Sequence, residues 1–112
     1  MSINSPLCKR LKEARKAAGL SQKRLGVAAG MDEFSASSRM NHYEMGRHEP
    51  DFATLRRIAK VVKVPVAFFY AEPDELADII FLFSNLKKSE RKSVIEMLNN
   101  NSIAAKKLKS RP

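Results

Sequence analysis

The stretch Gly30–Gly46, GMDEFSASSRMNHYEMG, decides how the rest of the chain is arranged. Its second half, about residues 36–44, predicts a short helix in which Ala36, Met40 and Tyr43 recur at i, i+4 and i+7 and form one apolar stripe. The opposite side carries short side chains that both donate and accept hydrogen bonds, namely Ser37, Ser38, Asn41 and His42. A helix with an apolar back and such a front suits the DNA major groove, where base edges present donors and acceptors.

The residues before this helix predict two shorter helices that support it. Residues 7–18 form an apolar stripe and end at Gly19, and Ser21 caps a helix of about two turns over residues 22–29. Gly26 lies inside that second helix, where glycine costs about 1 kcal/mol relative to alanine. We therefore expect another helix to approach Gly26 too closely for a side chain.

The connection over residues 30–35 contains two residues that could begin the third helix. Ser35 is the favoured N-cap, whereas Asp32 would begin the helix a turn earlier. Gly46 is expected to end the helix with a positive φ.

Further helices are predicted after Gly46. Asp51 caps a helix over residues 52–63, and Pro65 opens a short apolar helix that continues to Tyr70. A broad apolar helix follows over residues 74–88, and Ser89 is expected to cap a last helix that turns Val94, Ile95 and Leu98 inward. The chain is thus predicted to be all-α.

The charge is uneven along the 112 residues, whose net charge is +9. Residues 1–70 hold 13 basic and 6 acidic side chains, a net charge of +7, whereas residues 71–100 hold 4 basic and 6 acidic, a net charge of −2. The excess positive charge therefore accompanies the polar helix, as expected for a surface that binds phosphate. A basic face that only aids solubility is the alternative explanation.

Several classes of protein are not expected. No apolar run approaches the ~20 residues that cross a bilayer, and the first residues lack the apolar core of a signal peptide. Cys8 is the only cysteine, so no internal disulfide is possible, which fits the reducing cytoplasm and a nucleoid-associated protein that is bacterial or encoded by a phage or plasmid. Cys8 itself is expected to be a small buried residue. We find no nucleophile motif, phosphate-binding glycine loop or metal-ligand spacing, so we predict no enzyme activity, no metal and no cofactor.

The order of these residues resembles the Cro/C1-type (XRE-like) helix-turn-helix family over about residues 7–70. The likeness rests on the Ser21-Gln22 start of the second helix, Tyr43-Glu44-x-Gly46 at the end of the third, Pro50, and Thr54-Leu55-x-x-Ile58-Ala59 in the fourth. The resemblance implies a five-helix bundle, here with a C-terminal two-helix extension, and sequence-specific binding to double-stranded DNA as a dimer. One departure is a longer turn before the third helix, and Phe34 is expected to plug that turn against the core.

The resemblance also assigns roles to individual residues. Arg15 and Glu44 match a structural ion pair that ties the first helix to the end of the third. The positions that match DNA contacts, together with neighbouring basic side chains, are Gln22, Lys23, Ser37, Ser38, Arg39, Asn41, His42, Arg47 and His48.

The predicted domains are a DNA-binding domain over residues 1–72, a helical hairpin over 73–100 and a basic flexible tail over 101–112. The hairpin has more apolar surface than a small bundle can bury, so it is the predicted dimer interface. Its members are Ile79, Ile80, Phe81, Leu82, Phe83, Leu86, Val94, Met97 and Leu98. The sequence thus predicts a transcriptional regulator, in this family most often a repressor, that binds a palindromic operator as a homodimer. The alternative is a protein-interaction module such as an antitoxin that masks a toxin partner.

Overall fold

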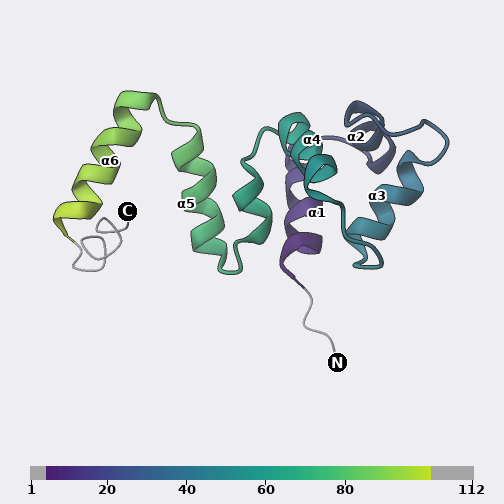
Figure 1. The fold of residues 1–112 in the computed structure, drawn as a ribbon, viewed down its shortest axis with the longest axis horizontal. Helices are drawn as coiled ribbons and strands as arrows, with labels where there is room; N and C mark the ends of the chain where they lie inside the picture. The colour runs from purple at the N-terminus through teal and green to yellow at the C-terminus, as the bar shows by residue number, and fades with distance from the viewer. Residues whose placement is uncertain (1–4, 102–112) are drawn as a thin grey trace. The chain divides into compact units, whose positions relative to one another are not determined.

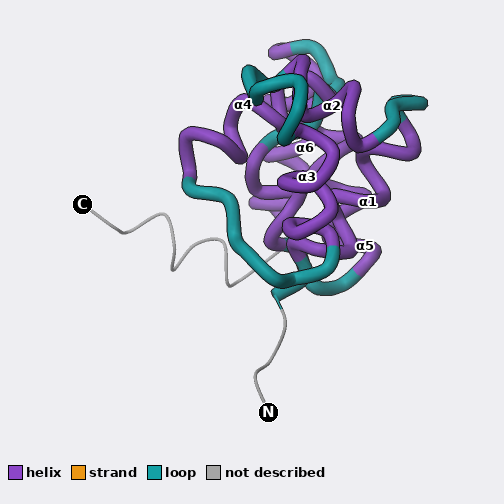
Figure 2. The backbone as a smooth tube through the Cα atoms, turned by 90° about the vertical axis from the view of Figure 1, so that its right-hand side faces the viewer, coloured by secondary structure: helices purple, strands orange, loops and turns teal. Residues whose placement is uncertain are grey.

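The computed structural model describes residues 5–101, and these residues form helices and loops without a strand (Figures 1 and 2). The α-helices are α1 (Leu7–Ala17), α2 (Gln22–Ala28), α3 (Ala36–Glu44), α4 (Phe52–Val62), α5 (Asp74–Ser84) and α6 (Lys88–Asn100), and η1 (Val66–Tyr70) is a 3₁₀ helix. The chain forms two compact units that divide between Phe81 and Leu82, within α5. The sequence instead suggested a boundary after residue 72. The predicted tail lies outside the described residues except for Asn101.

The first unit contains the five-helix bundle, whose core is built from the predicted apolar stripes. α1 packs against α3, α4 and η1, and α2 packs against α3 and α4. The side chains of Leu11, Leu25, Met40, Leu55 and Phe69 are fully buried in this core. The all-α prediction and the five-helix bundle are therefore confirmed.

Helix caps explain where two of these helices begin. The Ser21 hydroxyl accepts a hydrogen bond from Arg24 N at 3.1 Å, and the Asp51 carboxylate accepts one from Thr54 N at 2.8 Å. Each bond satisfies a backbone donor that the first turn of a helix leaves free. Both caps match the sequence prediction.

Arg10 is the charged side chain that the structure buries deepest, at 1 % exposure. Its guanidinium donates to the carbonyl oxygens of Ala71 (2.9 Å) and Glu72 (2.8 Å) and to the carboxylates of Glu13 and Asp74. Hydrogen bonds from Lys9 and Arg10 hold the pKa of the Asp74 carboxyl below its usual range. Arg10 thus fixes the start of α5 to α1.

The second unit begins at Leu82 and includes the last residues of α5 together with α6. α6 begins at Lys88 after Lys87, so the expectation that Ser89 caps it is wrong. The reason is that the Glu90 carboxylate accepts a hydrogen bond from Lys87 N at 2.9 Å. This bond satisfies the backbone N–H of Lys87, the N-cap residue one turn before Glu90.

The inward orientation expected for α6 is also wrong. Val94 is half-buried, and Ile95 and Leu98 are 47 % and 55 % exposed. None of the residues of α6 is buried.

Candidate nucleic-acid interface

α3 has the two faces that its sequence predicts. Ala36, Met40 and Tyr43 are buried, whereas Ser37, Ser38 and Asn41 are exposed and His42 is half-buried. The residue range Ala36–Glu44 agrees with the predicted helix. Among the residues that the structure describes, the polar face of α3 is therefore exposed at Ser37, Ser38 and Asn41 and half-exposed at His42.

α2 lies against the apolar back of α3 because Gly26 lets the two backbones approach. A Cβ placed on Gly26 would lie 2.8 Å from the Cβ of Ala36, closer than carbon atoms pack. The expectation of a close approach at Gly26 is confirmed. This contact sets the distance between the two helices.

A chain of hydrogen bonds joins α1, α2 and α3 at the edge of the polar face. Arg15 donates to both carboxylate oxygens of Glu44, at 2.6 and 3.0 Å. The Gln22 amide donates to Glu44 Oε1 at 3.3 Å and to Asn41 Oδ1 at 3.2 Å. Since the Asn41 oxygen faces Gln22, its NH₂ group is left for an outside acceptor, and the oxygen keeps a second lone pair.

The loop after α3 is held close to the helix end. Gly46 adopts a φ of +77°, and the backbone N–H of Arg47 donates to the carbonyl of His42 at 2.9 Å. The His42 and His48 rings lie 5.2 Å apart between centroids. Arg47 and His48 are exposed there, so their side chains extend the polar face past the end of α3.

Two of the predicted basic contacts are partly engaged within the protein. Arg39 donates from Nη2 to the Tyr43 hydroxyl at 3.1 Å. Lys23 Nζ lies 3.8 Å from the Glu33 carboxylate, and both side chains are mostly exposed. Such surface pairs contribute at most about 1 kcal/mol, so both cations remain able to turn toward phosphate.

The turn before α3 differs from its prediction at Phe34. Phe34 is 93 % exposed and does not plug the turn. Met31 fills that place instead, since it is buried and its sulfur lies 3.1 Å from the Cβ position of Gly26. α3 follows Ser35, but Asp32 makes the turn ahead of it by accepting hydrogen bonds from Phe34 N and Ala36 N.

The roles of Arg10 and of the Lys23–Glu33 pair were not predicted from the sequence. Arg10 lies at i+3 from Leu7 and i−4 from Ala14, which is the apolar stripe of α1, and this position was a usable signal. Cys8, expected to be buried, is half-buried.

Neither a metal site nor a membrane span is found among residues 5–101. No group of three or more His, Cys, Asp and Glu in these residues could hold a metal ion. None of the helices described here is both long and apolar enough to cross a membrane.

Comparison with known proteins gives two similarities. Residues 7–67 match the sequence pattern of the helix-turn-helix domain. The chain is also similar to the crystal structure of the transcriptional regulator BswR, with 46 % sequence identity and a TM-score of 0.79 over 88 % of this chain and 96 % of that chain. Because 88 % of this chain is more than residues 7–67 contain, the similarity to BswR includes part of the C-terminal segment. No curated protein matches the chain.

Proposed function

Because the chain belongs to the helix-turn-helix domain family, we propose that it is a transcriptional regulator of the Cro/C1 type, a repressor that binds a palindromic operator as a homodimer. The observation that carries the proposal is the hydrogen-bonded chain from Arg15 through Glu44 and Gln22 to Asn41. It ties the orientation of a groove-facing side chain to the core of the bundle, which is what base recognition requires. The proposal assigns no reaction to the protein and places it in the cytoplasm, at the bacterial nucleoid.

The proposed DNA contacts divide into two groups. Asn41 and His42, with Ser37 and Ser38, face base edges, because these side chains offer hydrogen bonds in the patterns that the major groove presents. Phosphate contacts come from the residues at the ends of the polar face and on α2, namely Lys23, Arg39, Arg47 and His48. The two amide hydrogens of Gln22 are engaged by Asn41 and Glu44, so this side chain instead braces Asn41. The net charge of +7 on residues 1–70 supports this group.

The proposed dimer interface lies in residues 74–100, which expose much apolar surface. Ile79 and Leu82 of α5 are 60 % and 62 % exposed, and Met97 and Leu98 of α6 are 56 % and 55 % exposed. Ile80 is different, because it packs against the core of its own bundle. Surfaces of this kind mark interaction sites, and a two-fold dimer would place two α3 helices about 34 Å apart, one turn of DNA.

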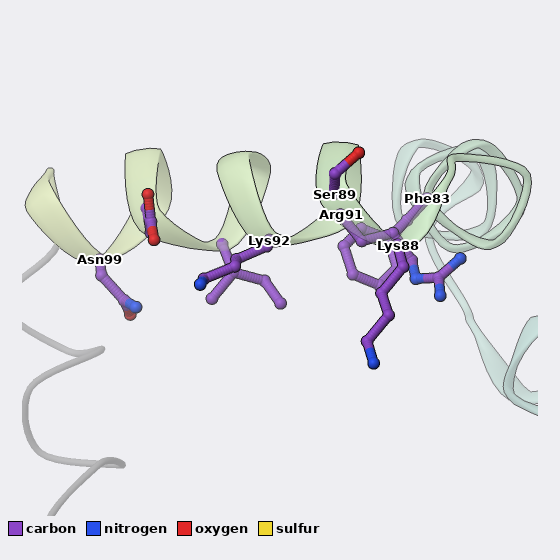
Figure 3. A pocket seen from close by; sticks show the side chains of 8 residues that line it. Phe83, Lys88, Ser89, Arg91, Lys92 and Asn99 are labelled. Carbon is purple, nitrogen blue, oxygen red and sulfur yellow. The ribbon is translucent and has the colours of Figure 1, made fainter.

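Charge complementarity supports a second copy of the chain as the partner. On α5, the exposed acidic side chains Glu75 and Asp78 flank Ile79 and Leu82. In the second unit, a groove beside α6 is lined by the apolar side chains Phe83 and Ile95, by three basic side chains and by the acidic side chain of Glu96 (Figure 3). The labelled members of this groove include Phe83, Lys88, Arg91 and Lys92. We therefore propose that the acidic face of α5 in one copy pairs with the basic groove of α6 in the other.

A charge exchange in the full-length chain tests the pairing. Glu75→Lys with Asp78→Lys should make the protein a monomer by sedimentation, as should Lys88→Glu with Lys92→Glu. A mixture of the two variants should recover a heterodimer. The matched control, Lys12→Glu with Lys16→Glu, reverses two exposed lysines on α1 and should leave the dimer intact. Dimers that persist in both test variants would rule out this pairing.

DNA binding itself is tested by selecting a preferred duplex from random sequences and titrating it at several salt concentrations. If the dimer neutralises about 6–10 phosphates, the slope of log K against log salt should be roughly −5 to −9. A slope near zero would reject the proposed phosphate surface.

The second candidate function is an antitoxin that masks a partner protein. The exposed apolar residues of α5 and α6 favour it, because a toxin could cover them as well as a second copy could. A chain that co-purifies with another protein and shows no preferred duplex would support this function over the first.

A further inference from the structure

We propose that Phe34 reads a thymine methyl group in the major groove and so determines part of the base sequence that the protein prefers. This inference rests on the proposed DNA binding through α3. It assigns a recognition role to a side chain outside α3 that the family comparison does not mark.

Phe34 is the most exposed large apolar side chain in the described part of the chain. Its exposure is 93 %, whereas Phe52 and Met45 reach 64 % and 63 %. An isolated exposed apolar residue is ordinary on a protein surface. What distinguishes Phe34 is how the turn holds it and where the turn lies.

The turn is fixed at both ends and in its middle. Met31 and Ala36 are buried on either side of it. The Asp32 carboxylate accepts a hydrogen bond from Phe34 N at 3.0 Å, and the Asp32 carbonyl accepts bonds from Ser35 N (3.1 Å) and Ala36 N (2.9 Å). Phe34 is thus held by an ordered backbone, which lowers the entropy lost when its ring contacts a ligand.

The turn lies at the end of α3 that faces the bases. In a helix-turn-helix protein the N-terminal residues of the recognition helix contact base edges, and Phe34 precedes the first residue of α3 by two positions. The Glu33 carboxylate lies 3.8 Å from Lys23 Nζ, so the turn folds back to the first turn of α2, where a phosphate contact is proposed. In the chain, Phe34 therefore lies between Glu33, which pairs with Lys23, and the first residues of α3.

The acidic neighbours of Phe34 are engaged within the protein. Asp32 binds the backbone of the turn, and Glu33 is paired with Lys23. The nearby Lys23 charge offsets that of Glu33, which lowers the repulsion between this carboxylate and a phosphate.

An aromatic ring at this place has one suitable partner on the base edges. Thymine presents a C5-methyl group in the major groove, and apolar side chains including Phe recognise it by contact. Burying one carbon of this size is worth about 0.8 kcal/mol, which corresponds to about fourfold in affinity.

The test replaces single thymines of the selected duplex by deoxyuridine, which lacks the methyl group and pairs in the same way. Wild-type protein should lose about fourfold in affinity at one position of each half-site and little elsewhere. Phe34→Ala should bind the thymine duplex about fourfold more weakly and should not respond to deoxyuridine at that position. Phe34→Leu, which keeps an apolar contact, should respond. Phe52→Ala is the matched control and should respond as the wild type does.

Each outcome decides the proposal. Two results for Phe34→Ala would overturn the contact between Phe34 and a methyl group: an affinity equal to that of the wild type, or the same loss of affinity at every deoxyuridine. Either result would favour a protein partner for the turn. The proposed function survives that result. A wild-type protein without any preferred duplex overturns both. Because Phe34 is exposed, the melting temperature of its variants should equal that of the wild type.

Discussion

The guanidinium of Arg15 and the carboxylate of Glu44 form two hydrogen bonds, Nε to Oε2 at 2.6 Å and Nη2 to Oε1 at 3.0 Å. The Arg15 and Glu44 side chains are 13 % and 4 % exposed. A third bond from Arg15, to the Leu20 carbonyl at 3.0 Å, satisfies the end of the guanidinium that Glu44 leaves free. The pair thus joins α1 to the last residue of α3. The hydrogen bonds to Glu44 raise the pKa of the Arg15 guanidinium above its ordinary value.

Removing the carboxylate should destabilise the fold more than it weakens any single DNA contact. Glu44→Ala leaves the Arg15 charge largely buried without its partner, which costs about 3–5 kcal/mol when such a pair is broken. Urea unfolding followed by circular dichroism measures the loss. Glu49→Ala, at an exposed position in the following loop, serves as the control. Equal unfolding midpoints for the two variants would reject the structural role of the pair.

Arg10→Ala should also destabilise the protein, because it removes the donors that satisfy the carbonyls of Ala71 and Glu72. Leaving a buried acceptor unsatisfied costs about 1–3 kcal/mol, so we expect about 3 kcal/mol for the substitution. The neighbouring Lys9→Ala removes a cation that is 61 % exposed and should cost less than about 1 kcal/mol. Thermal melts of the two variants test the difference, and similar losses would contradict it.

Gly26→Ala should lower the stability by about 1–3 kcal/mol despite the better helix propensity of alanine, because the new methyl group overpacks the contact with Ala36. Adding Ala36→Gly restores the missing space and should recover part of the loss in the double variant. Val27→Ala, at an exposed position of the same helix, is the control. A single variant that is as stable as the wild type would show that the helices separate easily.

Base and phosphate contacts should respond differently to substitution. Asn41→Ala should lose about 1–3 kcal/mol on the preferred duplex and relax the preference at one base pair. Arg47→Ala should weaken binding to all sequences alike. Competition binding against single-base variants of the duplex separates the two. Uniform losses for both variants would mean that α3 does not read bases through Asn41.

Stability at low pH should depend on Asp51. Hydrogen bonds from Thr54 lower the pKa of this carboxyl, whereas in the unfolded chain it is about 3.9. The ionised cap therefore stabilises the fold above that pH, and its contribution is lost as the pH falls through the lowered folded-state value. Asp51→Asn should melt at a lower temperature than the wild type at pH 7, and the difference should shrink below about pH 4. A difference that is constant with pH would contradict the linkage.

The helices of the bundle and the two faces of α3 can be inferred from the amino-acid sequence alone. Ala36, Met40 and Tyr43 recur with the period of a helix, and Ser21 and Asp51 supply oxygen acceptors one turn ahead of free backbone donors. These features are local, so they can be inferred from residues within about one or two turns of each other. The close approach at Gly26 was also predicted, because glycine destabilises the inside of a helix unless a neighbouring element leaves no room for a side chain.

Which polar and aromatic side chains are buried depends on tertiary contacts and could not be inferred from the sequence. Arg10 is buried because residues 71, 72 and 74, more than 60 positions later in the chain, supply the acceptors for its guanidinium. Phe34 is exposed because Met31 reaches the space beside Gly26, and Gln22 orients Asn41 because α2 and α3 pack at a distance that Gly26 and Ala36 set. In each case the outcome depends on how separate elements of the fold contact one another, and helix periodicity and capping contain no information about those contacts.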